Sequence, residues 1–174
     1  MVRFLVFAWL ALLVSAVNAD DSDYALAAGD VIRVHVYDEP DLSFDRILIG
    51  ESGKFSYPFL GDIRVNGLSL SELENTLIKG LKPDYLLDPK LSVSMVEYRP
   101  FFVSGEVKSP GSHSYQPGIK LRQAVSLAGG FTERASQSKI YVVHENDPDH
   151  RRIRVNLNYR VLPGDTITVE QSLF

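Results

Sequence analysis

Residues 31–37 read Val31-Ile32-Arg33-Val34-His35-Val36-Tyr37, and Ile32, Val34 and Val36 alternate with Arg33, His35 and Tyr37. This period of two places the apolar side chains on one face of an extended chain, as in a strand with one buried face. The same alternation recurs at residues 91–95, 152–157 and 166–170. The sequence therefore predicts several short, half-buried strands distributed over the chain.

Two other segments have helical spacing. The first begins with Ser69-Leu70-Ser71-Glu72, which has the spacing of a capping box, and its leucines recur at helical intervals. Gly80 and Pro83 are expected to end this helix. The second helix is expected to run from about Lys120 and to end at Gly129-Gly130, where glycine tolerates the left-handed conformation of a helix end.

The Arg99-Pro100 step is the expected domain boundary, because proline disfavours a helical residue before it and cannot donate to a central strand ladder. Each side of this step contains several short strands and one helix. We therefore predict an α+β fold of two small mixed-sheet domains, residues 20–99 and residues 100–174.

Residues 1–19 have the three-part layout of a secretory signal peptide: a basic start at Arg3, an apolar run, and small residues up to Ala19. The apolar run is shorter than the roughly 20 residues of a membrane-spanning helix. We expect cleavage after Ala19, and the alternative is an uncleaved N-terminal anchor.

The chain carries a formal net charge of −4 and contains no cysteine. A mildly acidic chain has little general attraction for nucleic acid, so nucleic-acid binding is not expected. Without cysteine there are no disulfides, thiolate metal sites or cysteine nucleophiles, and no cysteine-linked lipid anchor is expected.

Catalytic, cofactor-binding and metal-binding motifs do not emerge from the sequence. None of the four histidines forms a pair with zinc-ligand spacing. The acidic clusters at residues 38–41 and 145–149 each contain proline, which is typical of turns rather than of the carboxylate pair of a glycosidase. We therefore predict a protein that is not an enzyme and uses no cofactor or metal.

Basic residues cluster at His150-Arg151-Arg152-Ile153-Arg154. If this segment forms a strand, Arg152 and Arg154 share an exposed face and can contact an acidic glycan or the carboxylates of a partner. The alternative is a charged strand edge that deters edge-to-edge pairing.

A short repeat relates the two ends of the chain. Gly29-Asp30-Val31-Ile32-Arg33-Val34 is echoed by Gly164-Asp165-Thr166-Ile167-Thr168-Val169. In each copy, glycine permits a tight turn and aspartate can accept hydrogen bonds from nearby amides. Taken alone, the repeat indicates two similar turns that lead into strands.

Taken in order, these features resemble the polysaccharide biosynthesis/export family. The first half is similar to the export domain, and the second half is similar to a soluble-ligand-binding β-grasp domain. The resemblance implies structural roles for the residues of the shared motifs, which are Gly29, Asp30, Pro58, Gly61, Gly67, Gly105, Pro110, Gly111, Gly129, Gly130, Gly164 and Asp165.

The resemblance implies a component of a capsular or exopolysaccharide export machine that assists translocation of the polysaccharide across the envelope. It further implies a homo-oligomeric ring in the periplasm, associated with the outer-membrane export complex. The implied partners are an inner-membrane co-polymerase or chain-length regulator and an outer-membrane β-barrel. An alternative of another class is a free periplasmic protein that binds a sugar or other small ligand through its β-grasp half.

Larger members of this family carry a lipidated cysteine, a second β-grasp domain and a C-terminal amphipathic helix. We do not expect these features in this chain, and we therefore expect a separate barrel partner to provide the passage through the outer membrane.

Overall fold

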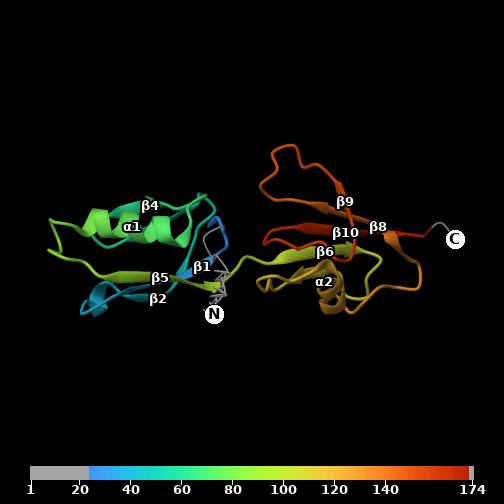
Figure 1. The fold of residues 1–174 in the computed structure, drawn as a ribbon, viewed down its shortest axis with the longest axis horizontal. Coiled ribbons are helices and arrows are strands. Elements are labelled where there is room, and N and C mark those ends of the chain that lie inside the picture. The colour runs from blue at the N-terminus through green and yellow to red at the C-terminus, as the bar shows by residue number, and fades with distance from the viewer. Residues whose placement is uncertain (1–23, 173–174) are drawn as a thin grey trace, which may run out of the picture.

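The computed structural model describes residues 24–172, so the expected signal peptide lies outside the described residues. Two helices and three sheets form an α+β fold, as predicted (Figure 1). One sheet and a hairpin belong to residues 24–98, called here the N-terminal half, and the third sheet belongs to residues 100–172, the C-terminal half.

The N-terminal half is built on a three-stranded antiparallel sheet of order β2-β1-β5. The hairpin β3-β4 pairs separately, and α1 packs against β5. The elements in chain order are β1 (Val31–Val36), the 3-10 helix η2 (Pro40–Leu42), β2 (Phe44–Leu48), β3 (Lys54–Tyr57), β4 (Gly61–Arg64), α1 (Leu70–Leu81) and β5 (Leu91–Glu97).

The central strand β1 has the predicted alternation. Ile32, Val34 and Val36 are buried, whereas Arg33 and His35 are exposed. Burial of one apolar face therefore fixes the register of this strand, because a slip by one residue would turn that face to solvent.

Helix α1 begins at the predicted capping box. The Ser69 hydroxyl accepts a hydrogen bond from the Glu72 amide at 3.2 Å, and the Glu72 carboxylate accepts one from the Ser69 amide at 2.8 Å. The helix ends at Leu81, between Gly80 and Pro83 as predicted, although Gly80 itself lies inside α1 and is not the residue that ends it. A Cβ at this position would lie 2.9 Å from Leu60 Cδ1, so close packing accounts for this glycine.

The C-terminal half contains a five-stranded mixed sheet of order β7-β6-β10-β8-β9. The central pair β6 and β10 is parallel, and the remaining pairs are antiparallel, with α2 between the two hairpins in the sequence. This is the β-grasp arrangement predicted for this half. The elements are β6 (Phe101–Gly105), β7 (Gly111–His113), α2 (Leu121–Leu127), β8 (Ala135–Val143), β9 (Ile153–Val155) and β10 (Thr166–Gln171).

The second helix ends where the sequence predicts. Gly129 and Gly130 follow α2 with φ of 77° and 84°. The prediction of alternating burial at residues 152–157 is wrong at Ile153, which is 43% exposed on the edge strand β9. An edge strand has a partner on one side only, so the periodicity alone did not determine its burial.

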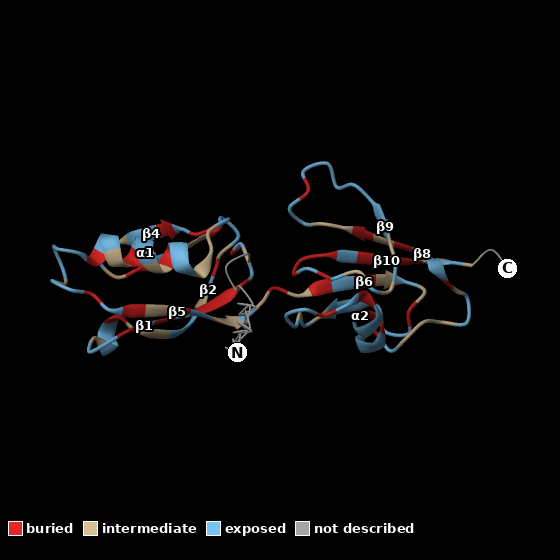
Figure 2. Ribbon diagram, in the orientation of Figure 1, coloured by how far each residue is buried: buried red, intermediate tan, exposed pale blue. Residues whose placement is uncertain are grey.

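The buried apolar side chains form two separate cores. The first extends from Leu26 to Val93 in the chain, and the second extends from Phe101 to Val169. Figure 2 shows the resulting alternation of buried and exposed residues along the strands. Arg99 lies between the two cores and is itself only 5% exposed, which makes the junction a polar contact rather than a continuation of either core.

Candidate functional site

Asp30 is a fully buried carboxylate close to the junction between the halves. It accepts hydrogen bonds from the Tyr24 hydroxyl at 2.7 Å and from the Ala27 amide at 2.9 Å. The amide and the guanidinium of Arg99 also donate to it, at 2.9 and 3.3 Å. A buried carboxylate is stable only with such a set of donors, so Asp30 anchors Arg99 to the N-terminal half.

Asp165 is the equivalent residue of the C-terminal half, and it is 1% exposed. It accepts hydrogen bonds from the Tyr159 hydroxyl at 3.3 Å and from the Leu162 amide at 2.8 Å. His144 Nδ1 lies 2.7 Å from its other carboxylate oxygen. In both turns the aspartate therefore binds a tyrosine six residues earlier, an amide three residues earlier, and a nitrogen-bearing side chain from another part of the chain.

The repeat is accordingly longer than its Gly-Asp turn. Residues 24–34 and residues 159–169 share tyrosine, glycine, aspartate, isoleucine and valine at equivalent positions. Leu26 and Val161, two residues after the tyrosines, are both fully buried. The tyrosine six residues before each aspartate is the sequence signal that would have extended the repeat.

Ion pairs connect the two aspartate turns across the junction. Arg99 Nε donates to Glu145 Oε2 at 2.7 Å, while Arg99 Nη1 donates to Asp30 and to the Tyr24 hydroxyl. Glu145 directly follows His144, the partner of Asp165. One guanidinium thus holds both halves, and Gly164 leaves room for it, since a Cβ there would overlap the Glu145 carboxylate and lie 2.9 Å from Arg99 Nε.

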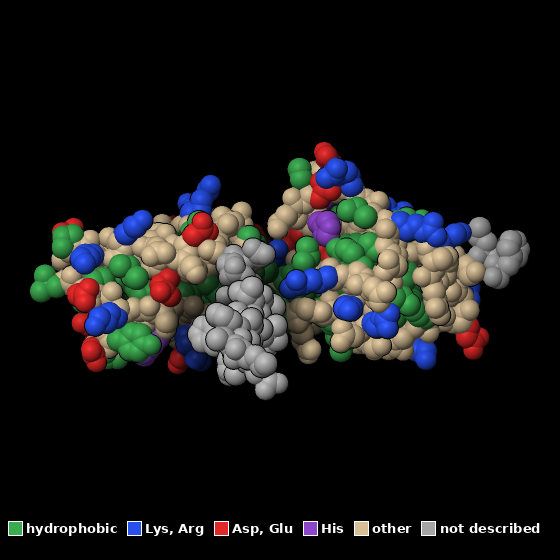
Figure 3. Space-filling view, in the orientation of Figure 1, with side chains coloured by type: hydrophobic (Ala, Val, Ile, Leu, Met, Phe, Trp, Pro, Cys, Tyr) green, Lys and Arg blue, Asp and Glu red, His purple; other side chains and the backbone are tan. Residues whose placement is uncertain are grey.

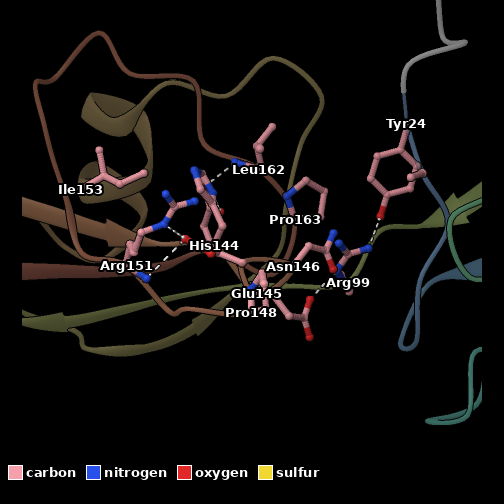
Figure 4. Close-up of a pocket in the computed structure, with 13 residues that line it drawn as sticks. Tyr24, Arg99, His144, Glu145, Asn146, Pro148, Arg151, Ile153, Leu162 and Pro163 are labelled. Carbon is pink, nitrogen blue, oxygen red and sulfur yellow. Dashed lines mark hydrogen bonds and ion pairs between the residues drawn. The ribbon is translucent and has the colours of Figure 1, made fainter.

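A cavity of about 470 Å³ lies beside this chain of contacts (Figure 4). Its walls come from both halves, because Tyr24 and Ala25 face the loop after β8 and the turn before β10. The complete lining is Tyr24, Ala25, Arg99, His144, Glu145, Asn146, Asp147, Pro148, Arg151, Ile153, Leu162, Pro163 and Asp165. Polar groups with partly apolar walls in a cleft between two units are typical of small-molecule sites.

Burial shifts the pKa of three side chains in the two aspartate turns. It raises the pKa of the Asp165 carboxyl, and hydrogen bonds from the Leu162 amide, His144 and Tyr159 oppose this shift. Burial, together with a neighbouring aspartate, raises the pKa of the Tyr24 and Tyr159 hydroxyls well above the usual range. Both tyrosines therefore remain hydrogen-bond donors at every physiological pH.

The motif glycines and prolines mark turns throughout the molecule rather than one site. A positive φ is shared by Gly29, Gly61, Gly67, Gly105, Gly111, Gly129, Gly130 and Gly164. Pro58 lies in the turn between β3 and β4, and Pro110 directly precedes β7. Of the twelve motif residues, only Asp165 lines the cavity, and Asp30 is bonded to two residues that do.

Arg152 and Arg154 lie at the edge strand β9 and do not line the cavity. The Arg152 guanidinium lies 4.4 Å from the centre of the Tyr141 ring and donates to Glu170 at 2.9 Å. Arg154 Nε donates to the Ser138 carbonyl at 2.7 Å. Contacts within the sheet thus engage both arginines, which fits the charged-edge alternative.

Sequence reasoning missed the residues that the fold gathers at the junction. Arg99 was recognised only as a boundary residue, and Glu145 and Asp147 only as part of a turn. Within residues 24–172 no group of three or more His, Asp or Glu side chains has the geometry of a metal site. No helix in the same range is long and apolar enough to cross a membrane.

Comparison with known families gives two matches in succession. Residues 18–96 match the polysaccharide biosynthesis/export protein family, and residues 100–155 match the SLBB domain. The step between the two matches coincides with the junction at Arg99 and Pro100.

Curated relatives are named for exopolysaccharide production, polysaccharide export and polysialic acid transport. The exopolysaccharide production protein ExoF of Rhizobium meliloti is 42% identical over 48% of this chain and 20% of its own length. The EPS I polysaccharide export outer membrane protein EpsA of Ralstonia nicotianae is 26% identical over 70% of this chain and 39% of its own length.

The polysialic acid transport protein KpsD of Escherichia coli is 29% identical over 78% of this chain and 24% of its own length. The chain therefore spans well under half the length of these relatives. The ordered pair of family matches, the two aspartate turns and these relatives lead to one conclusion: the chain belongs to the polysaccharide biosynthesis/export protein family.

Proposed function

We propose that this protein is a non-catalytic, periplasmic component of a capsular or exopolysaccharide export machine and assists translocation of the polysaccharide to the outer membrane. The observation that carries the proposal is the succession of an export domain and an SLBB domain along one chain. The relatives named for exopolysaccharide production, polysaccharide export and polysialic acid transport support it.

The proposal includes the processing and the domain structure of the chain. A signal peptide of residues 1–19 is removed after Ala19, and residues 20–99 and 100–174 form the two domains. The separate hydrophobic cores on either side of Arg99 support this division. Intact mass of the secreted protein tests the cleavage, and a species that begins before Asp20 would contradict it.

The proposal also includes the partners. Several copies form a ring, which acts beside an inner-membrane co-polymerase or chain-length regulator and an outer-membrane β-barrel. The junction supports a role in assembly, because a ring needs a fixed angle between the two halves of each subunit, and the Asp30–Arg99–Glu145 contacts supply such a fixed element.

A deletion strain tests the proposed function directly. Without the gene, extracellular polysaccharide should fall while polymer accumulates inside the envelope, and a plasmid copy should restore export. Normal export and normal polymer length in the deletion strain would contradict the proposal.

The second candidate is a free periplasmic protein that binds a sugar or another small ligand, and the junction cavity favours it. Light scattering coupled to size-exclusion chromatography separates the candidates. A ring component gives a mass that is a multiple of the subunit mass or binds the partner proteins, whereas the free binding protein remains a monomer.

A further inference from the structure

The charges around the junction cavity limit the ligands that it can hold. Its lining contains two arginines and three carboxylates, and both arginines are already paired. Arg151 Nε lies 2.9 Å from Asp147, and Arg99 binds Asp30 and Glu145. The carboxylates outnumber the arginines, so an anionic group that entered would be repelled by more charges than attract it, and the cavity disfavours acidic ligands.

The surroundings give no compensating positive field. On the face shown in Figure 3, basic side chains of the C-terminal half are spread over its surface in separate groups, and acidic side chains lie in its upper loop. Glu170 accepts a hydrogen bond from Arg152, just before β9, and the Ser138 carbonyl accepts one from Arg154 in β9. An acidic polymer would therefore gain little attraction along this route.

The apolar part of the lining is unusually exposed. Leu162 is 44% exposed and Ile153 is 43% exposed, although both are large aliphatic residues, and Pro163 lies beside Leu162 (Figure 4). Pro148 also lines the cavity. When a ligand covers exposed aliphatic side chains at the wall of a cavity, apolar surface is removed from water, and this favours binding. A ligand with one apolar face is therefore favoured.

Hydrogen-bonding groups border this apolar wall. Glu145 binds Arg99 through Oε2 only, which leaves Oε1 as an acceptor for a ligand hydroxyl. Among its bonds to the described residues, Arg99 uses Nε and Nη1, so Nη2 is the donor that remains. Asp147 and His144 add further polar atoms to the lining.

A neutral pyranose matches this combination. Its axial C–H groups form an apolar face, and its hydroxyls both donate to carboxylates and accept from arginine. We propose that the junction cavity binds a short segment of a neutral or N-acetylated glycan and discriminates against uronic acids. The inference rests on the proposed function, which supplies the glycan, and adds the class of sugar and its place of binding.

Nuclear magnetic resonance titration of the purified protein tests the inference. The probes are cellotetraose, chitotetraose and mannotetraose as neutral oligosaccharides, and tetragalacturonate as the acidic one. At least one neutral probe should shift the amides of Glu145, Leu162 and Gly164 saturably, and tetragalacturonate should not. Absence of saturable shifts with all three neutral probes, or equal binding of tetragalacturonate, would overturn the proposal.

Two variants sharpen the test. Leu162→Ala should weaken binding of the neutral probe about tenfold, because an apolar contact to the sugar is lost. Leu127→Ala is the matched control, since Leu127 has a similar exposure of 48% but lies on α2, away from the cavity. Equal weakening by both variants would place the sugar elsewhere.

Glu145→Gln tests whether the carboxylates of the lining exclude acidic sugars. It removes one carboxylate beside Arg99 and should allow tetragalacturonate to bind where the unaltered protein does not. Continued exclusion of tetragalacturonate by this variant would show that the Glu145 carboxylate does not cause the exclusion.

Polysaccharide export by the complemented deletion strain separates the two proposals. Restored export by a protein that binds no neutral probe would refute only the cavity inference, whereas normal export without the gene would refute the proposed function.

Discussion

At the scale of single residues, glycine is required at positions of positive φ either by backbone conformation alone or by conformation together with close packing. Gly105, at the end of β6, has φ of 84°, and a Cβ there would overlap the carbonyl oxygen of Val169 in β10. Gly61 has φ of 65°, but no atom lies within 4 Å of its Cβ position. The first glycine is required by close packing and conformation together, and the second by conformation alone.

Gly105→Ala should therefore destabilise the protein more than Gly61→Ala does. The latter should cost about 1–2 kcal/mol, which is the usual penalty of the left-handed conformation for a residue with a Cβ. The former must in addition separate the parallel pair β6-β10. Urea unfolding measures the free energy of unfolding of both variants. Equal decreases in the two variants would show that β10 can move away from the new Cβ at no cost in stability.

Asp165 makes the stability of the protein depend on pH in a defined direction. Burial raises its folded-state pKa above the ordinary value of an aspartate, so its protonated form is favoured in the folded protein. The resulting stabilisation is fully present below the unfolded pKa and is lost as pH rises through the folded pKa. The unfolding free energy of the unaltered protein minus that of Asp165→Asn should therefore decrease as pH rises through this window. An increase over the same window would contradict the assignment.

At the scale of elements, the capping box explains where α1 begins. Hydrogen bonds from Ser69 lower the pKa of the Glu72 carboxyl, the Ser69 amide contributing most. The stabilisation linked to Glu72 is therefore present above its unfolded pKa and is lost as pH falls through its folded pKa.

Ser69→Ala should lower the unfolding free energy by about 1 kcal/mol, because the Glu72 amide loses its acceptor. Ser71→Ala is the matched control, since Ser71 is an exposed serine in the same turn and is not the cap. Thermal unfolding at neutral pH compares the two. A loss of stability in the control that equals the loss in Ser69→Ala would assign the effect to the turn in general.

At the scale of the whole molecule, two ion pairs of Arg99, one with Asp30 and one with Glu145, connect the halves and favour one relative orientation. Glu145→Gln removes the Arg99 partner in the C-terminal half and should broaden the distribution of distances between the halves. Since Glu145 is about half exposed, the unfolding free energy should change by less than about 1 kcal/mol.

The chain contains no natural cysteine, so the cysteines introduced by Asn75→Cys and Gln137→Cys would be the only two sites for a thiol-reactive spin label. These positions are exposed and lie on α1 and β8. Pulsed electron–electron double resonance then reports the distribution of distances between the two spin labels. Glu97→Gln is the control, because it breaks the Arg46–Glu97 pair within the N-terminal half and should leave the distribution unchanged. Broadening in the control alone would contradict the role assigned to Arg99 and Glu145.

The α+β fold was predictable from local pattern because its causes are local. Alternation in β1 reflects one buried face, the Ser69–Glu72 box is complete within four residues, and Gly129-Gly130 ends α2 through its own backbone angles. The family was likewise recognisable from the order of short motifs. Gly80 and Ile153 were misjudged because their surroundings, Leu60 for one and a sheet edge for the other, are distant in sequence or depend on strand order.

By itself, the sequence determined the buried face of β1, the start of α1, the end of α2 and the Gly-Asp repeat, since each depends on residues a few positions apart. Only the tertiary structure brought Arg99 between Asp30 and Glu145, which lie 69 and 46 positions away along the chain. The same holds for the cavity, whose walls come from Tyr24 at one end and Leu162 near the other. Such contacts depend on how two separately packed cores are held together, and no local periodicity encodes that arrangement.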